Sequence, residues 1–106
     1  MSISVADLVT AILSAPATAP FPDSDTAIER VARLAATTAQ TQKQIRALVV
    51  YLNRLFDSGR TTDAANFLSY AVRTQPSIFY THKCIVMISG AFGDFIRNTW
   101  RGLPPD

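Results

Sequence analysis

The sequence predicts an all-α fold, a small elongated bundle of about four helices. Apolar residues recur at helical spacing along most of the chain, and prolines and glycines mark the ends of the helical segments. Hydrophobic residues make up 48% and charged residues 17% of the 106 residues, unlike the composition of disordered proteins. This length suits one domain, so residues 1–106 are expected to form a single helical domain.

The first element expected is a short helix over residues 5–14. Val5, Leu8 and Ile12 recur near helical spacing. A serine side chain, that of Ser4 or Ser2, is positioned to cap the start of this helix.

A proline-rich linker is expected over residues 15–23. Its three prolines have spacings that a helix interior does not accept, so the segment is expected to be extended. Such a linker either packs along a neighbouring helix or reaches across to a second copy, with Phe21 as its anchor.

The strongest signal in the sequence predicts a long helix over residues 24–58, the first part of a helical core over residues 24–101. Ser24 is a candidate N-cap, and Gly59 suits the C-terminal stop. About 34 residues at 1.5 Å each would give a helix about 50 Å long, hence an elongated molecule or a dimer. Its apolar face gathers the large aliphatic residues and one phenylalanine: Ile28, Val31, Leu34, Ile45, Leu48, Val49, Leu52, Leu55 and Phe56.

The middle of this predicted helix is its weakest part. Residues 35–42 are small or polar, and their three threonines lower the helix propensity. A continuous helix is the preferred interpretation, and the alternative is two helices joined near Thr37 to Gln42.

Another helix is expected after Gly59. Thr61 and Thr62 are candidate caps, alanines and large apolar residues follow, and Gln75-Pro76 stops the helix.

A C-terminal core helix is predicted over residues 76–100. Pro76 is favoured as a first helical residue, and no further proline occurs before Pro104. Gly90 and Gly93 interrupt the pattern, so either the helix breaks there or, as we prefer, another helix crosses close by. Residues 102–106 are expected to be a tail.

The sequence argues against an enzyme, because catalysis needs converging groups and this chain has one histidine, one cysteine and scattered carboxylates. His82 and Cys84 are two residues apart, and a helix would point them to different sides. We therefore expect no metal site, no cofactor and no small-molecule substrate.

The predicted location is intracellular, either cytoplasmic or nuclear. A lone cysteine suits a reducing compartment, and the start of the chain lacks the positive charge of a signal peptide. No segment approaches the roughly 18 uninterrupted apolar residues of a membrane span, so no membrane association is expected.

Charge is distributed unevenly along the sequence. Up to residue 39 there are two basic and four acidic residues, whereas residues 40–101 hold eight basic and three acidic residues. Eight of the ten basic residues are arginines, whose planar guanidinium groups suit phosphate contacts.

The leading functional hypothesis is a non-enzymatic helical module that self-associates, as a two-fold dimer, and binds another macromolecule. So short a chain cannot bury all the apolar surface that its composition provides, so we expect another copy or a protein partner to cover part of that surface. Trp, Tyr and Arg dominate binding energy at protein contacts, which makes Tyr51 (off the apolar face) and Trp100 candidate interface residues. Phe21, as the anchor of the linker, is the third candidate.

The alternative is a protein that binds an RNA or DNA backbone, for example a dimeric double-stranded RNA binder. On one continuous helix, four cations would fall opposite the apolar face and form a stripe suited to phosphates. With the arginine that follows this helix, the candidate nucleic-acid-binding residues are Arg33, Lys43, Arg46, Arg54 and Arg60.

Overall fold

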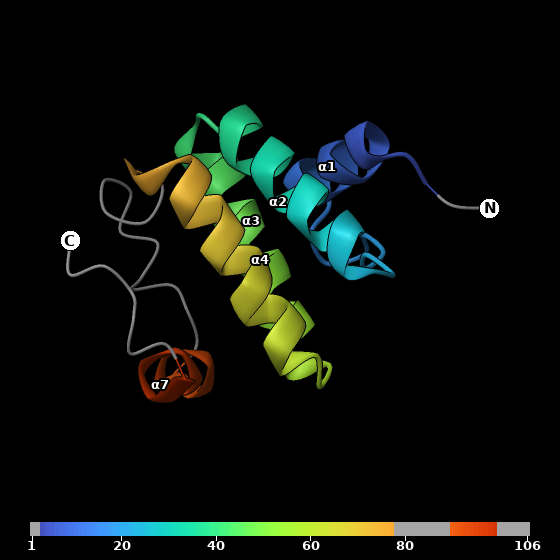
Figure 1. Cartoon of the computed structure of the whole chain (residues 1–106). Coiled ribbons are helices and arrows are strands. Elements are labelled where there is room, and N and C mark those ends of the chain that lie inside the picture. Colours follow the sequence, from blue (N-terminus) through green and yellow to red (C-terminus); the bar gives the residue numbers. More distant parts are fainter. Residues whose placement is uncertain (1–2, 78–89, 100–106) are drawn as a thin grey trace.

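The chain forms helices throughout the part that the structure describes (Figure 1). The structure is a computed structural model, and it describes residues 3–77 and 90–99, among which there is no strand. The five helices in these ranges are α1 (Val5–Ser14), α2 (Asp25–Thr38), α3 (Gln42–Asp57), α4 (Thr61–Thr74) and α7 (Gly90–Thr99). The all-α prediction is confirmed, with one more helix in these ranges than the four or so expected.

The first two helices begin at the caps that the sequence predicts. The Ser4 hydroxyl accepts a hydrogen bond from the backbone N–H of Asp7, at 3.1 Å. Ser24 does the same for Ala27, also at 3.1 Å. Each serine satisfies a backbone donor that the first helical turn leaves unpaired.

The long continuous helix over residues 24–58 is wrong, and the alternative of two joined helices is confirmed. α2 ends at Thr38, the backbone of its C-cap Ala39 is extended, and α3 begins after Thr41. Thr41 and Gln44 form a capping box in which each side chain accepts a hydrogen bond from the other residue's backbone N–H. A helix about 50 Å long would also exceed the molecule, whose principal extents are 38, 28 and 21 Å.

The turn into α4 uses a glycine but not the predicted threonine caps. Gly59 ends α3 with a φ of 94°, in the left-handed region that favours glycine. Thr61 and Thr62 lie inside the first turn of α4, and its N-cap residue Arg60 makes no side-chain capping bond. The predicted end of this helix is confirmed, because α4 stops before Gln75.

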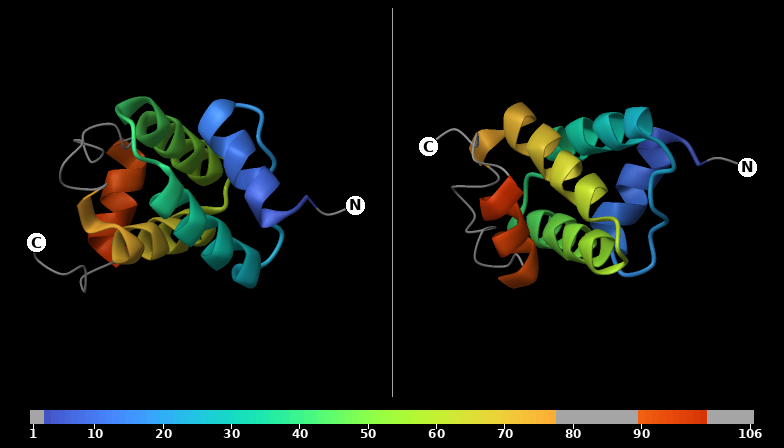
Figure 2. Two further views of the ribbon diagram at one scale, coloured as in Figure 1. Left: turned by 90° about the horizontal axis from the view of Figure 1, so that it is seen from above. Right: turned by 60° about the horizontal axis from the view of Figure 1, so that its bottom comes forward.

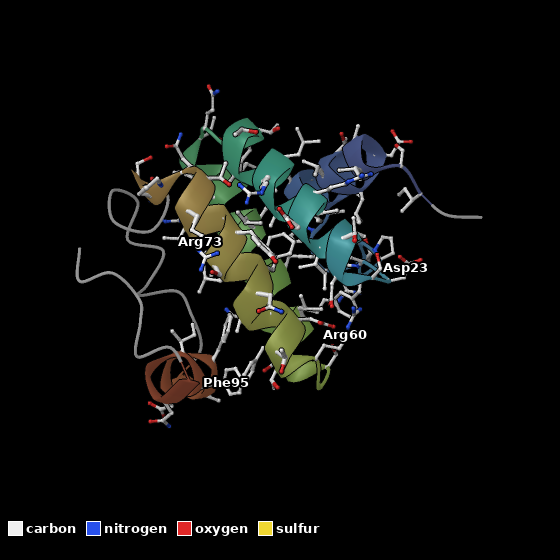
Figure 3. All side chains as sticks on the ribbon, viewed as in Figure 1. Asp23, Arg60, Arg73 and Phe95 are labelled. Atoms are coloured by element: carbon white, nitrogen blue, oxygen red, sulfur yellow. The ribbon has the colours of Figure 1, made fainter. Side chains whose placement is uncertain are left out.

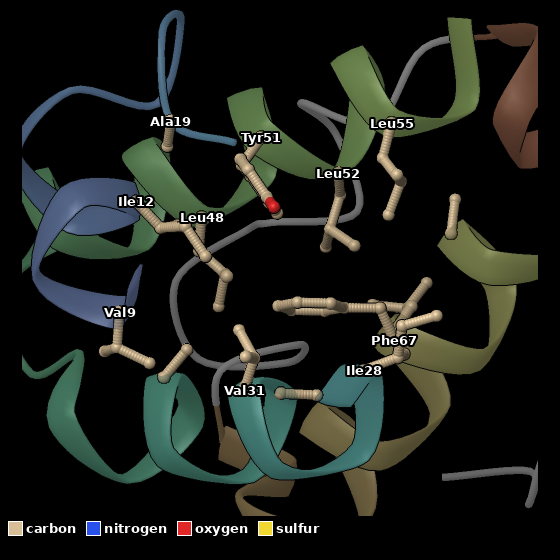
Figure 4. Packing of buried hydrophobic residues seen from close by; sticks show 14 of the residues in the cluster. Val9, Ile12, Ala19, Ile28, Val31, Leu48, Tyr51, Leu52, Leu55 and Phe67 are labelled. Carbon is tan, nitrogen blue, oxygen red and sulfur yellow. The ribbon is translucent and has the colours of Figure 1, made fainter. Parts of the chain in front are cut away.

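The core lies between two pairs of helices. α1 and α4 each pack against both α2 and α3, so α2 and α3 face each other across the interior (Figure 2). In the close view of the core, Tyr51 and Leu52 of α3 point toward Phe67 of α4 and toward α2 (Figure 4). All three side chains are buried.

A second, smaller cluster of buried side chains lies beneath the α2–α3 turn. It brings together the C-terminal half of α2, the N-terminal half of α3 and the C-terminal half of α4, through Ala36, Ala39, Ile45, Val49 and Ala71. Two small residues of the stretch that the sequence marks as weak, Ala36 at the end of α2 and Ala39 just after it, are therefore part of the buried interior.

The predicted helix over residues 76–100 is described only at its ends. Pro76 and Ser77 are helical, α7 covers Gly90–Thr99, and residues 78–89 lie outside the described residues. The preferred close crossing at the glycines finds no support in the described part of the chain, where no atom beyond the chain neighbours and the glycine's own helix backbone lies within 4 Å of a Cβ at Gly90 or Gly93. The tail over residues 102–106 is also outside the described ranges.

Candidate binding surfaces

The linker between α1 and α2 packs along α3 of the same chain. Arg54 donates hydrogen bonds to the backbone carbonyls of Pro16, at 3.0 Å, and of Ala19. The Phe21 ring lies beneath the guanidinium of Arg54, 4.4 Å from the ring centroid, and 5.7 Å from the ring of Tyr51. Of the two roles that the sequence left open for the linker, packing along a neighbouring helix is confirmed, and Phe21 is an anchor within its own chain.

Tyr51 was expected off the apolar face as an interface residue, and that placement is wrong because its side chain is fully buried. Its hydroxyl donates a hydrogen bond of 2.6 Å to the carbonyl of Pro20. Burial raises the pKa of Tyr51 to about 12, although the nearby Arg54 and Arg60 act to lower it. Tyr51 therefore joins the linker to the core and presents no surface to a partner.

Arg60 holds the end of the linker. Its guanidinium donates to the carbonyl of Pro22 at 2.6 Å and pairs with Asp63 at 2.7 Å. It also lies over the Phe21 ring, 5.6 Å from the centroid. Arg54 and Arg60 thus come together on one aromatic ring, where their donors serve backbone carbonyls.

Arg33 contacts α4 instead of lying in a row with the α3 cations. It pairs with Glu29 at 3.1 Å, donates to the hydroxyl of Thr74 at 3.4 Å, and lies 5.6 Å from the centre of the Tyr70 ring. α2 and α3 face each other across the core, so the single stripe that a continuous helix would have made does not form.

Two of the five candidate cations, Lys43 and Arg46, project from the outer face of α3 as exposed side chains. Among the described residues neither of them forms an ion pair, since the two pairs found there involve Arg33 and Arg60. One turn beyond Arg46 on the same helix face is Val50, 44% exposed. This row of Lys43, Arg46 and Val50 is called the α3 ridge below.

The two ends of the bundle differ in charge: carboxylates outnumber cations at the end where Arg54 and Arg60 hold the linker, and cations predominate at the other. Figure 3 shows Asp23 and Arg60 near one end and Arg73 toward the far end of α4. The contact of Arg60 with Pro22 places the starts of α2 and α4 together, and we call this end the acidic end because its carboxylates are Asp7, Asp23, Asp25, Asp57 and Asp63. The other end, over the second buried cluster, is called the basic end and carries Arg33, Lys43, Arg46 and Arg73.

A hollow of about 200 Å³ opens at the acidic end between α1, the linker and the start of α2. Its volume has room for several water molecules. Its lining is apolar except for one carboxylate, and consists of Ile3, Val5, Leu8, Pro20, Phe21, Pro22, Asp23, Ala27 and Val31. This hollow was not predicted, because its walls come from three segments whose packing the sequence pattern does not fix.

Large apolar side chains are exposed at three places in the described part of the chain. They are Ile3 at 46%, Leu34 at 37% and Val50 at 44%, each on a different segment. Ile3 lines the hollow, Val50 belongs to the α3 ridge, and Leu34 lies on α2.

α7 docks through aromatic rings onto the end of α3. Phe92 is fully buried and stacks on Phe56 with ring centroids 4.9 Å apart, and Phe95 meets the same ring edge-on at 5.6 Å. Trp100, the third predicted interface residue, lies outside the described residues.

Within the described ranges, no three His, Cys, Asp or Glu side chains converge as a metal site would require. His82 and Cys84 fall outside those ranges. None of the described helices combines the length and the hydropathy that crossing a bilayer requires.

Comparison of the chain with protein-family models, with curated proteins and with solved structures finds no match in any of the three.

Proposed function

We propose that this chain is a non-enzymatic helical module that self-associates and, through its surface, binds another macromolecule. The observation that carries the proposal is the separation of charge between the two ends of the bundle. Opposed surface potentials on one molecule attract a second copy and orient it.

The positions of the carboxylates support a binding role over catalysis. Asp7, Asp25 and Asp63 lie in the first turns of three different helices, where a negative charge stabilises the helix dipole. In the apolar hollow, Asp23 is the one ionisable residue of the lining. A general acid and base pair needs two such groups facing one substrate.

Self-association is tested by light scattering on purified protein over a concentration series at low and at moderate salt. We expect a mass that rises above the 11.6 kDa of one chain as concentration increases. The rise should be smaller at moderate salt, because salt screens exposed charges. A constant mass of one chain at high micromolar concentration and low salt would refute the proposal.

Binding to a nucleic-acid backbone is the second candidate, favoured by exposed cations at the basic end. Lys43, Arg46 and Arg73 are exposed and form no ion pair with any described residue. Phosphate contacts by such side chains release counterions, so affinity would fall steeply as salt rises. Arg54 and Arg60 are no longer part of this candidate surface, since they hold the linker.

A gel-shift series with double-stranded RNA and DNA tests this candidate. The Lys43→Glu/Arg46→Glu variant should lose the low-salt shift, whereas Arg30→Glu, which reverses an exposed cation farther from the basic end, should lose far less. No shift of the unaltered protein at low salt would eliminate nucleic acid as the partner.

We also place the chain in a reducing intracellular compartment, cytoplasmic or nuclear, on the basis of its lone Cys84. Fractionation of cells expressing the tagged protein, with thiol labelling of Cys84, tests this placement. Export or an oxidised thiol in the cell would contradict it.

A further inference from the structure

We infer that copies of this chain associate head to tail, with the α3 ridge of one copy docked in the apolar hollow of the next. The inference rests on the proposed self-association and names the two surfaces that meet. In this arrangement Val50 enters the hollow, and Arg46 reaches the carboxylate of Asp23 at its rim.

The α3 ridge has the composition of an interface anchor. Val50 is an exposed apolar side chain, and Arg46 and Lys43 precede it by one and two turns on the same face. An exposed valine gains free energy when water is removed from it, and the arginine supplies direction.

The hollow offers the opposite character. Its walls are the apolar side chains of Ile3 and Phe21 with the underlying helices, and Ile3 itself is 46% exposed. Asp23 lies in the lining and is exposed, and Asp25 follows at the start of α2. An apolar group that enters this hollow would bring a neighbouring cation close to Asp23 and Asp25. Arg54 and Arg60, which lie over the Phe21 ring, already donate to linker carbonyls.

Charge complementarity identifies a second copy as the occupant. A guest with one apolar side chain beside a cation fits the hollow, and the α3 ridge presents such a pair at i and i+4 in Arg46 and Val50. The hollow opens between α1, the linker and α2, whereas the ridge is an exposed face of α3, a helix that contributes no residue to the lining. One copy therefore cannot fill its own hollow with its own ridge.

Two different patches that meet make a heterologous interface. Each copy keeps one free ridge or one free hollow, so such contacts generate rings or open chains rather than a closed two-fold dimer. This differs from the two-fold dimer expected from the sequence, and the difference can be measured.

The decisive experiment mixes two variants, each blocked on one surface. Arg46→Ala/Val50→Ser disables the ridge and leaves the hollow intact, and Asp23→Lys repels an incoming arginine and leaves the ridge intact. Light scattering should give the mass of one chain for each variant alone. An equimolar mixture should give twice that mass and nothing larger, because only one intact interface can form.

Matched control variants show whether a loss of assembly comes from the ridge and the hollow, or from unfolding or a changed charge elsewhere. Arg30→Ala/Leu34→Ser alters a cation and an exposed apolar residue with the same spacing on α2, and Asp57→Lys reverses another exposed carboxylate at the acidic end. Both controls should assemble as the unaltered protein does. Circular dichroism and urea midpoints should match across all variants.

The outcomes distinguish failure of the head-to-tail contact from failure of self-association itself. An unaltered protein that stays a single chain overturns both. Assembly that survives in either blocked variant, or a mixture that stays at the mass of one chain, overturns the head-to-tail contact while self-association stands. Loss of assembly in the α2 control would assign the contact to α2 and also overturn the inference.

Discussion

Tyr51 connects the linker to the core through both ends of its side chain. Its ring lies between those of Phe21 and Phe67, with centroids 5.7 and 5.9 Å away, and its hydroxyl reaches the Pro20 carbonyl. The hydroxyl of this buried ring thus donates to the carbonyl of an exposed linker residue, at the boundary between the core and the linker. One side chain therefore fixes where the linker turns toward α2.

Removal of the Tyr51 hydroxyl should destabilise the fold. We expect Tyr51→Phe to cost about 1 kcal/mol, since it removes the hydrogen bond that joins the core to the linker. Urea denaturation should show a lower midpoint with an unchanged slope. Tyr70→Phe is the control, because the Tyr70 hydroxyl makes no hydrogen bond with the described residues, and an equal effect of both changes would contradict the assignment.

Burial of Tyr51 should also make the folded chain less stable at high pH. Burial raises the pKa of Tyr51 to about 12 from 10.0, so between these values the folded chain keeps a proton that the unfolded chain releases. The unfolded state then binds fewer protons, and stability falls as pH rises through this window. The urea midpoint of the unaltered protein should drop more between about pH 9 and about pH 11 than that of Tyr51→Phe. Parallel drops would argue against a buried phenol.

At the residue scale, the sequence showed which side chains are chemically able to bind but not which of them are free to do so. Arg54 and Tyr51 lie toward the edge of the α3 apolar face, where helical spacing alone suggests solvent. The linker covers that edge, and its backbone carbonyls accept hydrogen bonds from both side chains. Covering by a segment 30 or more residues away in sequence is a tertiary effect that periodicity does not encode.

At the scale of the elements, the caps decide where the helices begin and end. Ser4, Ser24 and Gly59 could be identified from the sequence alone because their local roles are strong. The Thr41 and Gln44 pair is an equally local signal, a T-x-x-Q capping box, that was missed because apolar residues recur at helical spacing on both sides of it. A capping box inside a segment is therefore stronger evidence for two helices than an apolar face along the whole segment is for one helix.

Loss of the Thr41 cap should weaken the start of α3. Thr41→Ala removes the acceptor of the Gln44 N–H and should cost about 1 kcal/mol of stability. Thr38→Ala, at the exposed last residue of α2, is the matched control and should be neutral or slightly stabilising. Chemical denaturation compares the two, and a larger loss in the control would disprove the capping role.

Two glycines should respond to alanine in opposite directions. Gly59 has a positive φ, so Gly59→Ala should destabilise the fold by about 1 kcal/mol. Gly93 lies within α7 and has open space around a Cβ among the described residues, so Gly93→Ala should stabilise by about 1 kcal/mol. Thermal melts of both variants measure the two signs, and a loss at Gly93 would mean that a neighbour approaches it.

At the scale of the whole molecule, the arrangement of helices puts charge at two poles and apolar side chains inside. No charged residue among the described ones is buried. The fold class followed from the sequence, because helical spacing and caps are local. The difference in charge between the two ends of the bundle could not be predicted from the sequence. It depends on tertiary packing, which places the linker and the start of α4 beside the start of α2.

Docking of α7 should contribute to the stability of the whole fold. Phe92 is buried against Phe56, so Phe92→Ala should cost roughly 3 to 5 kcal/mol. Asn98→Ala, an exposed change on the same helix, should cost little. Two melting transitions, or an unchanged midpoint for Phe92→Ala, would indicate that α7 is not part of the cooperative unit.

The placement of α2 and α3 on opposite sides of the interior also bears on how the chain folds during synthesis. α1 and α4 each pack on both of these helices, and α4 makes the larger contact with each. A nascent chain that ends before α4 therefore has α2 and α3 packed against α1 alone, and the apolar faces that α4 covers are still exposed. We therefore expect cooperative folding only after Thr74 has left the ribosome, with those apolar surfaces open to chaperones until then.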